Sequence, residues 1–354
     1  MRETEAVADA RRAMEICNAC RFCEGFCAVF PAMEQRREFS PADLGYLANL
    51  CHGCRGCFYA CQYAPPHEFG INVPQAFARV RAESYADYAW PSFMGGVFAR
   101  SGTVVSVVAA AAIAVILLLA SGGMSGAHVG AGAFYAVIPY GAMVWVAGMT
   151  FVYALVAMAM SGVAFWRAGG GGMPTRRFVA EGLHGAMTLK NLGGGGDGCN
   201  YPGEALSGTR KWLHHALFYG FLLCFAATSV ATLMHHVLGW VAPYSWYSLP
   251  VVFGFVGGVL MTVGACGLIG MKAVADPAPA AMRLLGGEYA LLFLLLLVAV
   301  TGLALLLLRA TGGMGALLAV HLGCVLALFL VMPYSKFIHG VHRSLALVRD
   351  AMER

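Results

Sequence analysis

The chain contains two matching cysteine runs, Cys17-Asn-Ala-Cys-Arg-Phe-Cys-Glu-Gly-Phe-Cys27 and Cys51-His-Gly-Cys-Arg-Gly-Cys-Phe-Tyr-Ala-Cys61. Both have the spacing C-x2-C-x2-C-x3-C, and together they hold eight of the twelve cysteines in the 354-residue sequence. A disulfide scaffold would spread its bridges over a short secreted chain. Eight cysteines in one repeated pattern therefore indicate a metal-binding domain in a reducing compartment.

This spacing is typical of proteins that bind two [4Fe–4S] clusters, because three successive thiolates wrap one cluster and the fourth reaches the other. We therefore assign the first three cysteines of each run, with the last cysteine of the other run, to one cluster. The two predicted ligand sets are Cys17, Cys20, Cys23 and Cys61, and Cys51, Cys54, Cys57 and Cys27. Zinc is the main alternative. Zinc sites usually pair two separated C-x2-C knuckles, and four cysteines within eleven residues fit that pattern poorly.

Residues 1–92 are predicted to form a polar, cytoplasmic, ferredoxin-like head. Its charges nearly cancel, with ten Lys and Arg against eleven Asp and Glu through Arg100. Ser40-Pro-Ala-Asp43 has the hydroxyl, proline and acid of a helix start, and the stretch before Cys17 also favours a helix. The N-terminal residues lack the apolar segment of a signal peptide, so we expect the head to stay in the cytoplasm.

Residues 93–354 are predicted to form a membrane domain. The whole sequence is 59% hydrophobic and 12% charged, with a mean hydropathy of +0.69; a soluble protein has about twice that charged fraction. Four uncharged runs of 66, 60, 20 and 26 residues hold two, two, one and one helices, since a span needs about 20 apolar residues. The predicted fold is all-α, with six spans at 102–121, 140–163, 214–238, 249–271, 289–308 and 315–337.

The distribution of basic residues predicts the orientation of these spans. Lys and Arg gather in the segments 167–211 and 272–288 and in the C-terminal tail. The alternate loops near 122–132 and 239–248 carry none, and only Arg309 departs from the pattern. By the positive-inside rule, we expect a multi-pass protein of the bacterial inner membrane with both termini cytoplasmic. Basic residues confined to loops also argue against a nucleic-acid partner.

Two glycine-rich pieces lie in the 167–211 segment, at 169–172 and 193–196. Neither is followed by the Lys-Ser/Thr of a phosphate-binding loop, and no strand pattern precedes either. Composition therefore favours flexible loops at both places.

Five histidines lie near the ends of the third and sixth predicted spans. His214 begins the third span on the cytoplasmic side, and His235 and His236 end it on the far side. His321 and His339 are 18 residues apart in or just beyond the sixth span, which in one helix is five turns and about 27 Å. Because these spans run antiparallel, His214 matches His339 in depth, and His235 or His236 matches His321.

Matched histidines at two depths predict one or two b-type haems. Imidazole is an axial haem ligand, bundles place cofactors between facing helices, and ionisable groups at membrane depth are usually functional. The alternative for each histidine is an interfacial position or a simple hydrogen bond, and it stays open here.

The chain resembles a known family at several of these places. The cysteine runs, the loop Gly193-Gly-Gly-Gly-Asp-Gly-Cys-Asn-Tyr-Pro202 and the segment Lys211-Trp-Leu-His-His-Ala-Leu-Phe-Tyr-Gly-Phe221 resemble the tricarballylate-utilization iron–sulfur proteins (TcuB) and the C-terminal half of the CobZ fusion. The segment Pro333-Tyr-Ser-Lys-Phe-Ile-His339, with His321, is similar to the last haem-bearing helix of the nitrate reductase γ subunit. The resemblance implies a cytoplasmic FAD-containing dehydrogenase as partner, oxidising tricarballylate to cis-aconitate, and a membrane quinone as electron acceptor.

The sequence thus predicts an electron relay from reduced flavin through two [4Fe–4S] clusters and haem b to quinone. No nucleophile or catalytic base stands out, as expected where cofactors carry the chemistry. Three alternatives remain at this point: a CobZ-like electron partner in cobalamin synthesis, a membrane subunit of a quinol- or thiol-linked reductase, and a transporter with a regulatory metal domain.

Overall fold

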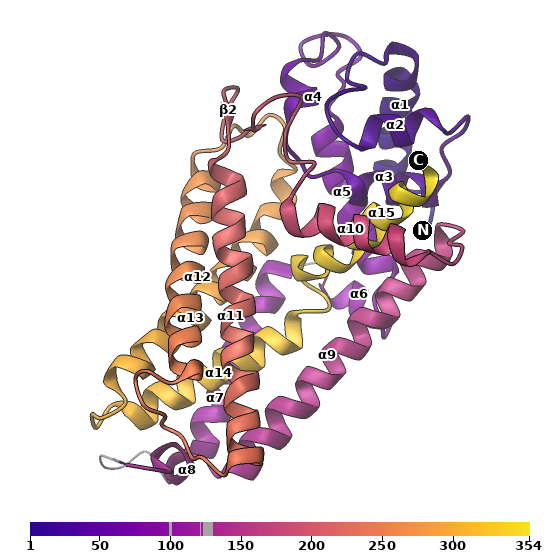
Figure 1. Cartoon of the computed structure of the whole chain (residues 1–354). Helices are drawn as coiled ribbons and strands as arrows, with labels where there is room; N and C mark the ends of the chain where they lie inside the picture. Colours follow the sequence, from indigo (N-terminus) through magenta and orange to yellow (C-terminus); the bar gives the residue numbers. More distant parts are fainter. Residues whose placement is uncertain (99–100, 121, 123–129) are drawn as a thin grey trace.

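The computed structural model describes residues 1–98, 101–120, 122 and 130–354. The described chain is mainly helical, with one short antiparallel sheet of β1 (Cys199–Asn200) and β2 (Leu206–Ser207). Figure 1 shows the N-terminal helices as a head at one end of a bundle of long helices, with both chain ends beside the head. Most of the loop predicted near 122–132 lies outside the described residues.

The head is helical, as predicted. Its helix α3 starts as its sequence indicates: the Ser40 hydroxyl accepts a hydrogen bond from the Asp43 backbone N–H at 3.2 Å, with Pro41 in the first turn. The head core is apolar and includes Val7, Leu47 and Phe77, all fully buried. The head helices are α1 (Glu5–Cys20), α2 (Val29–Glu34), α3 (Pro41–Leu50), α4 (Gly56–Tyr59), α5 (Val73–Asp87) and α6 (Phe93–Val97).

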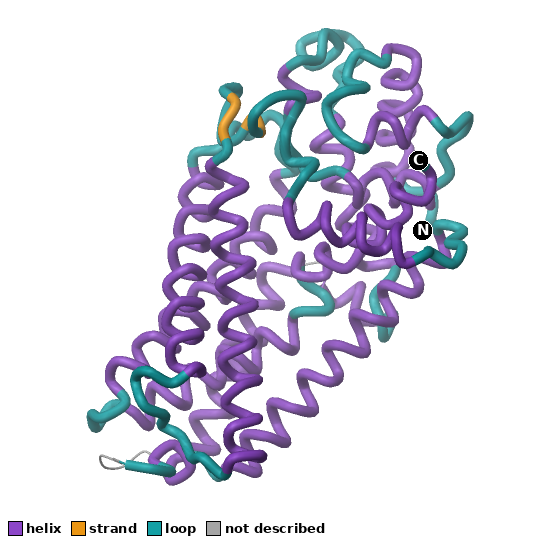
Figure 2. The backbone as a smooth tube through the Cα atoms, in the orientation of Figure 1, coloured by secondary structure: helices purple, strands orange, loops and turns teal. Residues whose placement is uncertain are grey.

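Six helices of the described chain are long and apolar enough to cross a membrane, which confirms the predicted number (Figure 2). Their outer faces leave large apolar side chains uncovered, such as Trp145 and Val237, which are 70% and 73% exposed. Such faces suit lipid rather than water, so the protein is a multi-pass membrane protein. The six are α7 (Ser101–Ala120), α9 (Tyr140–Ala168), α11 (Thr209–Leu238), α12 (Leu249–Ala273), α13 (Leu285–Leu308) and α14 (Met314–Val331). The short helix α8 (Ala133–Val137) precedes α9, and the turn η2 (Met282–Leu284) precedes α13.

Helices α11 and α12 pack closely because glycines line their contact. A Cβ added to Gly220 would lie 2.7 Å from the Met261 backbone nitrogen, and one added to Gly264 would lie 2.5 Å from that of Leu217. Small residues are what membrane helices use to bring backbones together. Helix α14 packs elsewhere, against α7, α13 and α9.

The sixth span is shorter than predicted, and one prediction built on it is wrong. Helix α14 ends at Val331, before Pro333, and α15 (His339–Glu353) starts only after the short turn η3 (Lys336–Ile338). Proline lacks a backbone N–H and clashes with the carbonyl four residues earlier. His321 and His339 therefore lie on two separate helices, and the five-turn spacing does not set how their rings are related.

Two amphipathic helices that the sequence analysis left as loop or tail lie between the bundle and the head. Helix α10 (Arg176–Thr188) packs on α15, where an added Cβ at Gly182 would come within 2.6 Å of the Val348 backbone nitrogen. Helix α15 contributes Ala346 and Leu347 to the head core. The C-terminal segment is thus part of the head's support.

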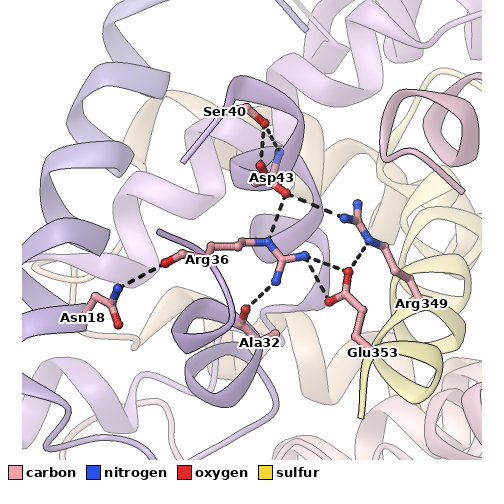
Figure 3. Close-up of polar contacts among 7 residues, drawn as sticks. All are labelled: Asn18, Ala32, Arg36, Ser40, Asp43, Arg349 and Glu353. Atoms are coloured by element: carbon pink, nitrogen blue, oxygen red, sulfur yellow. Dashed lines mark hydrogen bonds and ion pairs between the residues drawn. The ribbon is translucent and has the colours of Figure 1, made fainter. Parts of the chain in front are cut away.

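A partly buried charge network fastens α15 to the head (Figure 3). The Arg36 side chain is 9% exposed, and its guanidinium donates to the Asp43 carboxylate at 3.0 Å and to Glu353 at 2.8 and 3.0 Å. Arg349 of α15 pairs with Glu353 at 2.7 Å and approaches Asp43 to 3.7 Å. The Asp43 and Glu353 carboxylates therefore each face two cations. This pairing offsets the free-energy cost of removing the carboxylates from water.

We expect Arg36→Ala to lower the thermal unfolding temperature of the purified protein. The substitution leaves two partly buried carboxylates short of a partner, a loss of about 2–3 kcal/mol. The matched control is Arg79→Ala, because Arg79 is 45% exposed and only within 4.0 Å of Asp9; such a pair contributes less than about 1 kcal/mol. Circular dichroism melts in detergent measure both. Equal shifts for the two variants would contradict the structural role given to Arg36.

Candidate metal centres

The head holds two cysteine-lined cavities. The first has a volume of about 130 Å³ and is lined by all four members of the first predicted ligand set, together with Cys57. The second is smaller, about 10 Å³, and contains all four members of the second set. Each cavity thus includes three cysteines of one run and the last cysteine of the other, and Cys57 lines both. No three His, Cys, Asp or Glu side chains within the described ranges converge closely enough to hold a single metal ion.

The two runs use the same backbone turn. Arg21 and Arg55, each directly after the second cysteine of its run, have positive φ angles of 56° and 69°. A side-chain-bearing residue seldom adopts this left-handed conformation, and such residues collect at functional sites. The turn ends α1 after Cys20 and lets the chain fold back, so that Cys23 lines the same cavity as Cys17.

The chemistry of these thiols fits a cationic cluster. Burial, followed by the neighbouring Cys61 thiol, raises the pKa of Cys17 and of Cys23 to about 12. Burial also raises the pKa values of Cys27 and Cys57 well above the ordinary range. The thiols therefore stay protonated at neutral pH until iron displaces the protons. Four thiols around one cavity match the number that a [4Fe–4S] cluster takes; the assignment of each ligand remains a prediction.

His214 and His339 lie together at the head end of the membrane domain. Their ring centroids are 6.2 Å apart and the rings are perpendicular, at 88°. An imidazole–metal bond is about 2 Å long, so this separation leaves room for one metal atom between the rings. The His339 Nδ1 donates to the Lys336 carbonyl at 2.5 Å, which leaves Nε2 free as a ligand.

The protonation state of His339 also suits a ligand. Burial, then the Arg343 cation and the His214 ring, lowers the pKa of His339 well below its ordinary value. The ring is therefore neutral at pH 7, as metal binding requires. The Nδ1 of His214 is buried without a hydrogen-bond partner in the described chain. This pair fits the two axial ligands of a haem.

The three histidines predicted for an outer haem have other neighbours. His235 stacks on the Tyr140 ring with centroids 4.0 Å apart, and the His236 Nε2 lies 2.7 Å from the Tyr140 hydroxyl. The His321 Nδ1 lies 3.1 Å from the Thr301 hydroxyl of α13. The structure does not bring His321 into ring contact with either of the other two, because α14 packs on α13 and α7 rather than along α11. The outer haem therefore stays a prediction from the sequence.

The glycine loop before β1 has a structural role that composition did not predict. The Gly194 carbonyl packs against Gly56 of the second cysteine run so closely that an added Cβ would lie 2.4 Å from its oxygen. The Asn200 N–H donates to the Cys54 carbonyl at 2.9 Å. The loop is therefore packed against the second cysteine run rather than free. The glycine run in the sequence was the available signal, since glycine permits close backbone contact as well as flexibility.

Comparison with known proteins gives one matching family model for the head and one for the membrane domain. Residues 10–87 match the family model described as the citrate utilization protein B Fer4-like domain, and residues 99–354 match that described as citrate utilization protein B. The chain is 46% identical over 355 residues to citrate utilization protein B of Escherichia coli, covering 99% of this chain and 93% of that protein. No solved structure matches the chain significantly.

We expect substitutions in the two runs to group by cavity rather than by run. Cys17→Ser and Cys61→Ser should alter the same cluster signal in electron paramagnetic resonance spectra, because both thiols line the first cavity. Cys27→Ser and Cys51→Ser should alter the other signal. Cys266→Ser is the control, because this thiol is exposed on α12. Grouping of Cys61→Ser with Cys51→Ser would contradict crossed ligation.

Proposed function

The chain belongs to the citrate utilization protein B family, and we propose that it carries electrons from a cytoplasmic flavoprotein dehydrogenase to a membrane quinone. Its Fer4-like domain indicates an iron–sulfur electron-transfer role. The proposal adds two [4Fe–4S] clusters in the head, one b-type haem between His214 and His339, and the two redox partners. These cofactors supply one-electron steps between two-electron donors and acceptors.

The observation that carries the proposal is the succession of donor side chains from the head into the bundle. Thiols line two cavities in the aqueous head, and the His214–His339 pair lies near the first residues of α11 and α15. The head end of the bundle also carries the cationic side chains that the positive-inside rule places in the cytoplasm. We therefore place the head and both termini on the cytoplasmic side of a bacterial inner membrane.

The two proposed partners exchange equal numbers of electrons and protons. A reduced flavin yields two electrons and two protons, and a quinone takes up two of each, so the chain need only carry electrons one at a time. We propose an FAD-containing dehydrogenase that oxidises a tricarboxylate of the tricarballylate type. The name of the Escherichia coli relative refers to citrate, which is also a tricarboxylate, and this supports the substrate class.

Optical spectra of the purified protein test the haem assignment. We expect a reduced α-band that disappears in His214→Ala and His339→Ala, while both cluster signals remain. His215→Ala is the matched control, because His215 contacts Trp212 and Tyr219 on its own helix instead of His339. An α-band that survives both substitutions, or that is missing from the unaltered protein, would remove the haem from the proposal.

Reduction by a partner tests the relay itself. Adding a flavoprotein dehydrogenase with its tricarboxylate should reduce the clusters, and adding a short-chain quinone should reoxidise them. The unaltered protein mixed with dehydrogenase lacking substrate is the control. Clusters that stay oxidised in the complete mixture would contradict the proposed donor.

A further inference from the structure

Three guanidinium groups converge on the backbone of the second cysteine run. Arg81 donates to the carbonyls of Ala48 and Cys51 at 2.8 and 2.9 Å. Arg343 donates to the Cys51 carbonyl at 2.8 Å, and Arg210 donates to the Gly53 carbonyl at 2.6 Å. Three cations therefore hold the second cysteine run. Neither the predicted clusters nor the haem site described above accounts for these contacts.

These arginines come from different parts of the fold. Arg81 belongs to α5 of the head, Arg210 to the start of α11 and Arg343 to α15. Arg210 precedes His214 by four residues, and Arg343 follows His339 by four. Residues four apart are neighbours on one helix face. His214 and His339 are thus each one helical turn from an arginine that holds the second cysteine run.

The first cavity lacks this connection. Its lining includes Phe22, which is 64% exposed. Its four predicted ligands are all partly accessible, whereas two of the four in the second set, Cys51 and Cys54, are buried. The two cavities therefore differ in their contacts: the predicted ligands of the first are all partly accessible, and two residues that line the second, Cys51 and Gly53, are bonded to the helices that carry His214 and His339.

We propose that Arg210 and Arg343 are positioning residues that couple the second cavity to the histidine pair and make its cluster the one that delivers electrons to the membrane. This inference rests on the proposed function, and it assigns the first cavity to electron uptake. An electron that reaches the second cavity leaves the first cluster oxidised by one electron and the second reduced by one. The order follows from the contacts, since only the second run, among the described residues, shares arginines with both histidine-bearing helices.

The charge of these side chains also favours that order. A cation close to a cluster stabilises its more negative, reduced form and raises its reduction potential. Few anions are available to neutralise the three arginines. The nearby Glu288 carboxylate is already paired with Lys272 and Lys336. The second cluster should therefore hold an electron more strongly than the first.

The test is a redox titration of the purified full-length protein, followed by electron paramagnetic resonance with chemical mediators. Arg343→Gln should lower the potential of one cluster, changing the electron distribution between the clusters about tenfold, or about 59 mV for a one-electron couple. The affected signal should be the one that Cys54→Ser alters. Arg343→Lys, which keeps the charge, should retain most of the potential.

Two further variants complete the design. Arg210→Gln should shift the same signal in the same direction, and it guards against a folding defect in the Arg343 variant. Arg79→Gln is the control, since Arg79 is on the same helix as Arg81 but is 45% exposed and faces Asp9 at 4.0 Å. A shift in the first cluster instead, equal shifts in both, or loss of cluster iron from both glutamine variants would overturn the proposal.

This titration separates the inference from the proposed function. It uses mediators and needs neither a flavoprotein nor a quinone. A failure of the dehydrogenase to reduce the protein would contradict the donor while leaving the potential shifts interpretable. Unchanged potentials in a protein that the dehydrogenase reduces would contradict the role of the arginines alone.

Discussion

The bond between the Cys51 carbonyl and the arginines around it is the constraint on which the rest of the structure depends. Buried guanidinium groups need acceptors, and buried carbonyls need donors. Here the acceptors belong to a cysteine run of the head, while two of the donors belong to α11 and α15. The head and the membrane domain therefore satisfy each other's polar groups, and neither end of this junction is complete alone.

The break at Pro333 makes this junction possible. If α14 continued as one helix, the residues after it would extend past the bundle instead of turning beneath the head. After the break, α15 places Leu347 in the head core and Glu353 beside Arg36, while His339 comes to lie beside His214. One proline thus separates the apolar span from a segment that fastens the head and supplies an imidazole.

The two ends of the membrane domain differ in chemistry. At the head end, cations, the His214–His339 pair and buried carbonyls lie close together. At the far end, His235 and His236 contact Tyr140, and Arg309 donates to the Tyr244 carbonyl. The far histidines have the neighbours of structural side chains, so the redox chemistry proposed here belongs to the head end.

The sequence by itself determined the features that depend on local pattern. Cysteine spacing predicted which thiols share a cavity, uncharged runs predicted six spans, and Ser40 with Pro41 predicted the start of α3. It did not determine α10, α15 or the packed glycine loop, because their form depends on the surfaces they meet. The pairing of His214 with His339, the separation of His321 from its predicted partners and the convergence of Arg81, Arg210 and Arg343 were decided only by tertiary structure. Residues that are more than a hundred positions apart meet through the packing of whole helices, and neither hydrophobic period nor motif spacing predicts that contact.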